Sequence, residues 1–164
     1  MGKWFGVIAV LIFVALPLLI FLAGQFNLFA GRRPDNLGPR NGLLRPPTFD
    51  GRNVVHSQAA RHEHAPHHLI APIAYTGNGQ AAMTELLHVL QNMKGAVVVT
   101  ADPTYIHAEF KSLMFNMVDD AEFLLDEADS VIHMRSGSRF GRKDFGANRS
   151  RLEKIRAYFN AQSA

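Results

Sequence analysis

Five polar side chains of catalytic type fall in three neighbouring segments near the centre of the chain: His107, Glu109, Glu122, His133 and Arg135. His107 and Glu109 are two residues apart, so both point to the same face if their segment is a strand. Two imidazoles and two carboxylates that converge can bind a divalent metal or do acid–base chemistry. The alternative is a solvated sheet face with cross-strand charge pairs. We favour that alternative, and expect His107→Ala or Glu109→Ala to cost less than about 1 kcal/mol of stability.

Histidines also cluster ahead of these segments. His56, His62, His64, His67 and His68 lie within 13 residues. Imidazole-rich tracts bind zinc, nickel or copper. The surrounding prolines offer no preformed geometry, so we expect weak binding and no functional metal site or cofactor.

A polar loop around residues 136–149 could bind an anion just before a predicted helix. Its candidate ligand-binding residues are Ser136, Ser138, Arg139, Asp144, Asn148 and Arg149. Backbone N–H groups at a helix N-terminus attract anions, and an arginine adds a planar pair of donors. In the alternative, Asp144 or Asn148 caps the helix and Arg139 pairs with Asp119 or Asp120.

Composition excludes several functions. The 164 residues include 17 Lys and Arg, 14 Asp and Glu, and no cysteine. This balance is too even for a dedicated nucleic-acid binder. The absence of cysteine excludes disulfides, thiolate catalysis and iron–sulfur clusters within the chain.

Charge is arranged in blocks along the second half of the chain. Residues 102–129 carry eight acids and one base, whereas residues 135–156 carry eight bases and two acids. The two blocks can neutralise one another across the sheet, or the basic one can face anionic lipid.

The N-terminal region, residues 1–30, is predicted to be a single transmembrane anchor. The uncharged run from Trp4 to Gly24 would span roughly 32 Å as a helix, close to the thickness of a bilayer core. A cleaved signal peptide is the alternative, but its apolar core is usually shorter, and Gln25 stands where a lipoprotein signal has cysteine. Arg32, Arg33 and Arg40 after the run favour a cytoplasmic domain by the positive-inside bias.

The rest of the chain divides into a Pro-, Gly- and His-rich linker arm at residues 31–68 and a domain at 69–164. The domain pattern predicts a strand at 70–75, a helix over 82–93, strands at 96–101, 105–111, 121–126 and 131–135, and a last helix after Gly146. Strands with one polar face and two amphipathic helices indicate an α+β fold, a two-layer sandwich of an antiparallel sheet with two helices.

Four motifs then carry a family resemblance. They are the tracts 105–112 (YIHAEFKS), 118–123 (VDDAEF), 135–139 (RSGSR) and 144–149 (DFGANR). In this order they resemble domain of unknown function 1499, over about residues 37–159. The resemblance implies no activity. Members often carry secretion signals, which implies a periplasmic domain at a bacterial inner membrane.

We therefore expect a single-pass membrane protein with a non-enzymatic interaction or anionic-ligand-binding module. Its expected partners are the lipid bilayer and either a membrane protein or an anionic lipid, with no nucleic acid. The alternative is a small metal-dependent hydrolase that uses the polar sheet face.

Overall fold

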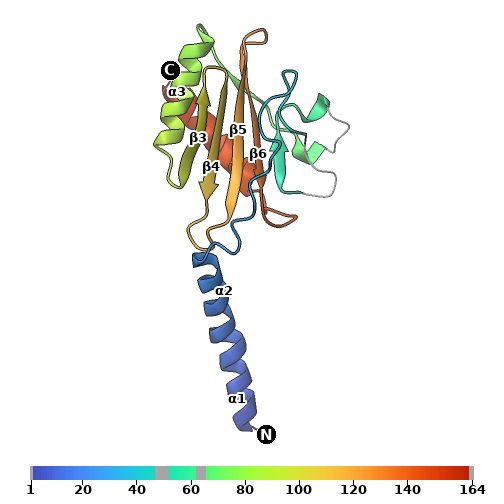
Figure 1. Ribbon diagram of the computed structural model, residues 1–164, viewed down its shortest axis with the longest axis vertical. Coiled ribbons are helices and arrows are strands. Elements are labelled where there is room, and N and C mark those ends of the chain that lie inside the picture. The colour runs from blue at the N-terminus through green and yellow to red at the C-terminus, as the bar shows by residue number, and fades with distance from the viewer. Residues whose placement is uncertain (1, 47–51, 62–65, 163–164) are drawn as a thin grey trace.

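An apolar helix leads into the folded domain (Figure 1). The computed structural model describes residues 2–46, 52–61 and 66–162. The helix consists of α1 (Gly2–Val10), a π-helical turn η1 (Leu11–Ala15) and α2 (Leu16–Gln25). The π turn ends just before Pro17, whose ring lacks an N–H and displaces the carbonyl four residues earlier. Trp4–Gln25 is long and apolar enough to cross a membrane, a property that signal sequences share.

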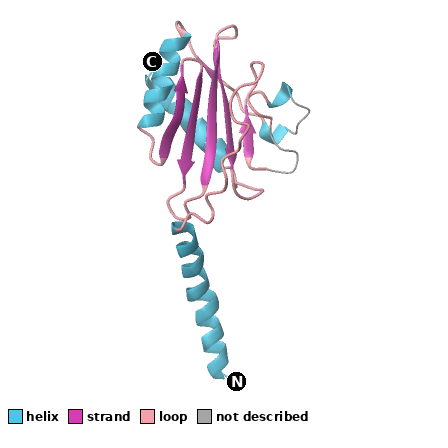
Figure 2. Cartoon of the chain, viewed as in Figure 1, coloured by secondary structure: helices cyan, strands magenta, loops and turns pink. Residues whose placement is uncertain are grey.

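One antiparallel sheet forms the centre of the domain (Figure 2). Strands β3 (Ala96–Asp102), β4 (Tyr105–Lys111), β5 (Val118–Asp126) and β6 (Val131–Ser138) follow one another as hairpins. The short strands β1 (Val54–His56) and β2 (Ile73–Ala74) both pair with β6. Alternation along β4 and β5 places apolar residues on one face and polar residues on the other.

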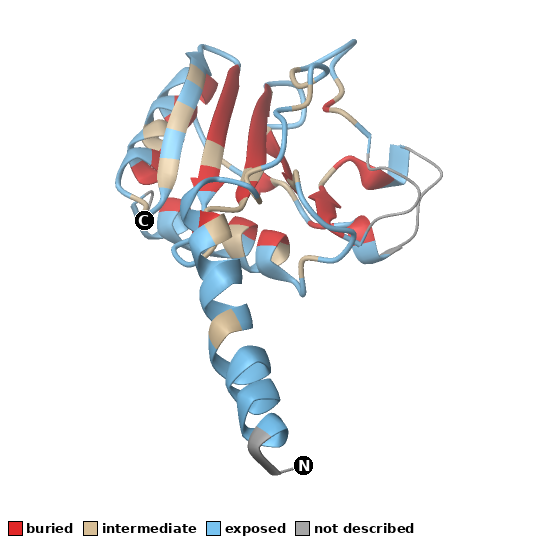
Figure 3. Ribbon diagram, turned by 60° about the horizontal axis from the view of Figure 1, so that its bottom comes forward, coloured by how far each residue is buried: buried red, intermediate tan, exposed pale blue. Residues whose placement is uncertain are grey.

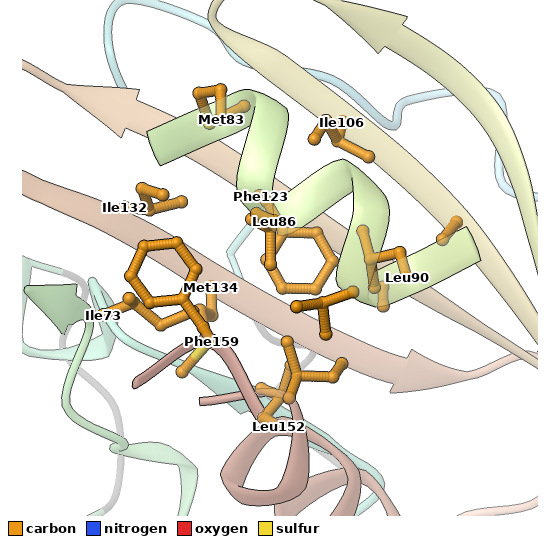
Figure 4. Close-up of a cluster of buried hydrophobic side chains, with 14 of the residues drawn as sticks. Ile73, Met83, Leu86, Leu90, Ile106, Phe123, Ile132, Met134, Leu152 and Phe159 are labelled. Carbon is orange, nitrogen blue, oxygen red and sulfur yellow. The ribbon is translucent and has the colours of Figure 1, made fainter. Parts of the chain in front are cut away.

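Two helices, α3 (Gly79–Gln91) and α4 (Ala147–Gln162), cover the apolar face. The Asn78 side chain accepts a hydrogen bond from the Ala81 N–H and so fixes the start of α3. The core between sheet and helices is shown in Figure 4 and includes Leu86, Phe123, Met134, Leu152 and Phe159. The predicted α+β architecture is confirmed, although the strand expected at 70–75 is reduced to two residues.

The segment expected to be an arm without regular structure contributes to the domain. β1 lies within it and pairs with β6, and residues 31–46 cross the polar face of the sheet while α4 lies behind (Figure 1). Leu44 packs there with Tyr105 and Leu124 as a second small core. A three-residue strand is too short to show a period, so the hydrophobic pattern could not reveal it.

The polar face of the sheet was expected to be solvated, but this segment buries it. His107 is 4% exposed and Glu122 is fully buried. Figure 3 shows that buried residues extend along the central strands. The small cost expected for His107→Ala assumed an exposed side chain, and that assumption is wrong.

Candidate functional site on the polar sheet face

Polar residues occupy two adjacent rows across β4, β5 and β6. In one row, His107 is opposite Glu122, and Glu122 is opposite Arg135. In the next row, Glu109 is opposite Asp120. Antiparallel register thus brings together four of the five residues expected to share this face, and adds Asp120 to them.

Glu122 is held by three donors. Its Oε2 accepts from Arg135 Nη1 at 2.9 Å, and its Oε1 accepts from Tyr105 Oη at 2.9 Å and from the Gly38 N–H at 2.8 Å. Burial and the Glu122 charge raise the pKa of Tyr105, so its hydroxyl remains a donor. Burial lowers the pKa of Arg135 against the effect of Glu122. A carboxylate with these partners is fixed in place and has little capacity left to act as a base.

Asp120 and Glu109 share Arg139. Asp120 accepts from Arg139 Nε at 2.8 Å, from Arg139 Nη2 at 2.6 Å and from His107 Nε2 at 2.8 Å. Glu109 accepts from Arg139 Nη2 at 2.6 Å and from Arg33 Nε at 2.7 Å. Burial alone would raise the pKa of both carboxyls. Hydrogen bonds from Arg139, with His107 for Asp120 and Arg33 for Glu109, outweigh it and bring both pKa values below the ordinary range.

This network does not fit a metal site. His107, Glu109 and Asp120 each offer a ligand atom, and the three atoms lie within 4.8 Å of one another. Arg139 Nη2, however, already lies 2.6 Å from an oxygen of each carboxylate. A divalent ion at the same oxygens would meet the guanidinium charge at close range.

The loop residues expected to bind an anion bond mainly to one another. Asn148 is buried, with its Oδ1 2.5 Å from Ser136 Oγ and its Nδ2 2.9 Å from Ser138 Oγ. Asp144 accepts from the N–H groups of Gly146 and Asn148 at the start of α4. These bonds correspond to the capping alternative.

Two arginines of the same region also have internal acceptors. Arg149 donates to the carbonyls of His67 and Leu69, which ties α4 to the segment before β2. Arg139 pairs with Asp120, whereas the neighbouring Asp119 pairs with Arg151 of α4 at 2.6 Å. The two adjacent aspartates therefore lie on opposite faces of β5.

The two buried histidines of the cluster, His56 and His68, bond to the backbone. His56 accepts the Gln58 N–H at Nδ1, so its Nε2, 3.3 Å from the Leu44 carbonyl, carries the hydrogen and the ring is neutral. His68 Nδ1 lies 2.7 Å from the Val54 carbonyl. Both rings join β1 to the chain around it.

His67 is exposed, and the centroid of its ring lies 4.1 Å from that of the buried His68. His62 and His64 lie outside the described residues.

His133 lies apart from the hydrogen-bonded network that Arg135 and Arg139 form with Glu122, Asp120 and Glu109. Its Nδ1 is 3.2 Å from Ser57 Oγ, and its Nε2 is 3.4 Å from Asp126. Burial lowers the pKa of His133, and the nearby Asp126 only partly offsets this effect. Of the five candidate catalytic residues, it is the one that the register leaves outside the network.

The sequence named Asp120 only as a possible partner of Arg139 and did not make Tyr105 a site candidate, although both alternate in step with Glu122 and His107. Arg33 and the backbone of Gly38 gave no such signal, because their contacts span 76 and 84 residues.

The apolar helix ends directly on the domain. Gln25 Nε2 donates to the Met114 carbonyl, and Asn116 Nδ2 donates to the Gly24 carbonyl, both at 3.1 Å. A Cβ on Gly24 would lie 2.8 Å from the Phe115 Cα, so glycine permits this close approach. The β4–β5 loop at residues 112–117 is thus the helix-docking loop (Figure 1).

A basic groove of about 360 Å³ opens at the same end of the domain. Lys94, Lys111, Arg151 and Lys154 line it, and its lining contains no acidic residue. Arg151 pairs with Asp119, whereas the three lysines have no acidic partner within the described ranges. The groove therefore carries a local excess of positive charge.

Comparison with known proteins assigns a family without assigning an activity. No curated protein matches the chain. A family model described as "Protein of unknown function (DUF1499)" matches residues 46–159. These residues include the whole antiparallel sheet and most of α4. The chain belongs to the DUF1499 family.

Proposed function

We propose that this protein is a membrane-anchored, non-enzymatic module whose domain binds anionic lipid headgroups at the end where the apolar helix joins it. The observation that carries the proposal is the basic groove, with its three lysines, at that end. A lysine near an anionic bilayer surface contributes about 1 kcal/mol to binding.

The helix contacts support an anchor that is retained. Gly24 packs against Phe115, and two polar side chains join the helix end to the helix-docking loop. Phe29 also packs on Phe115 and Phe140, with ring centroids 6.4 and 5.5 Å apart. Cleavage of a signal peptide near Gln25 would remove the packing of Gly24 against Phe115. These contacts therefore favour an apolar helix that is retained in the mature protein.

Exposed apolar side chains flank the basic groove at this end. Leu113 and Met114 in the helix-docking loop and Phe145 before α4 are all exposed, and Phe145 is 98% exposed. Apolar side chains next to lysines are typical of surfaces that contact both the acyl boundary and the headgroups.

The polar face supports a structural role over catalysis. Glu122 and Asp120 are buried and each accepts several hydrogen bonds from arginine and neighbouring donors. A general base must reach a substrate proton, which these carboxylates do not do in this conformation. The hydrolase alternative therefore has less support than the binding module.

The test uses the full-length chain in nanodiscs of phosphatidylcholine, with and without phosphatidylglycerol. Hydrogen exchange is measured in the helix-docking loop and in the first turn of α4. We expect phosphatidylglycerol to slow exchange there several-fold. The double variant Lys111→Gln/Lys154→Gln should lose this effect.

The matched control is Arg40→Gln/Arg61→Gln, which removes two exposed charges away from the groove and should behave like the wild type. Equal exchange in the two lipid compositions would contradict headgroup binding. Separately, the intact mass of membrane-extracted protein tests the anchor, and a mature N-terminus near Gln25 would exclude it.

A further inference from the structure

A small polar cavity lies between the segment that covers the polar face and strands β1 and β6. Its volume is about 70 Å³, enough for several water molecules or one small ion. Arg45, Asn53, Asp120, Arg135 and Gly137 are among its lining residues. None of these residues lines the basic groove.

Two buried polar atoms in the cavity lining have no hydrogen-bond partner in the described part of the chain: Arg135 Nε and Asn53 Oδ1. Arg135 is 4% exposed and Asn53 is 8% exposed. Buried polar groups are nearly always paired, and an unpaired one costs about 1–3 kcal/mol. Both residues line the cavity, so an occupant that contacted these two atoms would give each of them a partner.

The orientation of the Asn53 amide follows from its other bonds. Its Nδ2 donates to the Gly141 carbonyl at 2.7 Å and to the Ser138 carbonyl at 3.3 Å. A carbonyl only accepts, so the nitrogen must face these two groups, and Oδ1 is the atom left for the cavity. An occupant must thus donate a hydrogen to Asn53.

The charges around the cavity favour an anion. Arg45 is half-buried and has no acidic partner among the described residues. Besides burial, its charge contributes to lowering the pKa of Arg135. Asp120 is already paired with Arg139, and Glu122 with Arg135. Within the described residues, the positive charge of Arg45 therefore remains without a neutralising partner.

We propose that this cavity binds a small oxyanion that carries a hydroxyl group, such as hydrogen phosphate. Its oxygens accept from Arg135 Nε and from the Arg45 guanidinium, and its hydroxyl donates to Asn53 Oδ1. A water molecule satisfies Arg135 Nε and Asn53 Oδ1 but leaves the Arg45 charge uncompensated. Gly137 also lines the cavity, and a Cβ there would lie 3.0 Å from Val54 Cγ2 and 3.4 Å from Arg135 Nη2.

The test is isothermal titration of the full-length protein, in nanodiscs of phosphatidylcholine alone, with inorganic phosphate and with sulfate. We expect saturable binding of phosphate and weaker binding of sulfate, because sulfate at neutral pH has no hydroxyl to donate. Arg45→Gln should weaken phosphate binding at least about tenfold, through loss of a charge-assisted bond. Arg40→Gln removes an exposed arginine of the same segment and should leave the affinity unchanged.

The proposal is overturned by an absence of saturable phosphate binding, by equal affinity in Arg45→Gln and Arg40→Gln, or by sulfate binding as tight as phosphate. The phosphate–sulfate comparison needs no variant, so it stands even if Arg45→Gln alters the fold. Lys111→Gln/Lys154→Gln should leave phosphate affinity unchanged. A loss of affinity in that variant would place the anion in the basic groove and contradict the cavity.

Discussion

Replacing Arg139 with glutamine should destabilise the domain strongly. The change removes two hydrogen bonds to Asp120, at 2.6 and 2.8 Å, and one to Glu109. Asp120 is 1% exposed and would keep the hydrogen bond from His107 Nε2 but lose its arginine partner. Two charge-assisted bonds at about 1.5–3 kcal/mol each agree with the 3–5 kcal/mol typical of a broken buried ion pair. For a domain of this size, the loss would lower the melting temperature by roughly 10–20 °C.

The assay is thermal unfolding of the full-length protein in detergent micelles, followed by circular dichroism. The matched control is Arg32→Gln, because Arg32 pairs with Asp35 on the surface, where both side chains are more than 80% exposed. Exposed pairs contribute little, so this variant should melt close to the wild type. Equal melting temperatures for the two variants would refute the argument from the buried pair.

The pairing of Arg139 with Asp120 and Glu109 also predicts how the stability lost in Arg139→Gln changes with pH. The pKa values of Asp120 and Glu109 lie below their ordinary values of 3.8 and 4.5. A carboxyl with a lowered pKa stabilises the fold above its ordinary value and loses this contribution as the pH falls through its folded-state pKa. The stability that Arg139→Gln loses relative to the wild type should therefore be largest at neutral pH and shrink in acid. A loss that stays constant down to pH 2 would contradict the conclusion that Arg139 stabilises the two ionised carboxylates.

Three further predictions concern single residues. Burial holds the pKa of His133 below its ordinary value of 6.5, so the unfolded chain takes up a proton more readily than the folded one, and stability falls as the pH drops below about 6.5. His133→Gln should therefore make the free energy of unfolding, measured with urea, depend less steeply on pH. Gly24→Leu should speed hydrogen exchange in the helix-docking loop by forcing the helix away from Phe115, whereas Gly6→Leu, with open space around it, should not; equal exchange would contradict the docking. His107→Ala should cost about 2 kcal/mol in the same urea assay by removing a hydrogen bond to a buried carboxylate, and a cost below 0.5 kcal/mol would indicate an exposed site.

The elements that follow a regular period were predictable from the sequence. Alternation of Ile106, Ala108 and Phe110 indicated β4, and Leu152, Ile155 and Phe159 indicated α4. These patterns work because each element buries a face whose period is set by its own backbone geometry.

The state of the polar face was not predictable in the same way. Local spacing placed His107 and Glu109 on one face but could not tell whether water or protein covers that face. The cover comes from residues 31–46, whose Gly38 N–H reaches Glu122 through an irregular stretch of chain. A contact of this kind depends on the whole fold and leaves no local pattern.

That covering segment has a practical consequence for the design of fragments. The family match begins at residue 46, the last residue of the cover, whereas Leu44 and the donors Arg33 and Gly38 precede it. A fragment cut at the family boundary would expose the Glu122 carboxylate and one side of Leu124 to solvent. The shortest fragment that keeps both faces of the sheet covered begins near residue 31. The boundary of the family match therefore differs from the boundary of the folded domain.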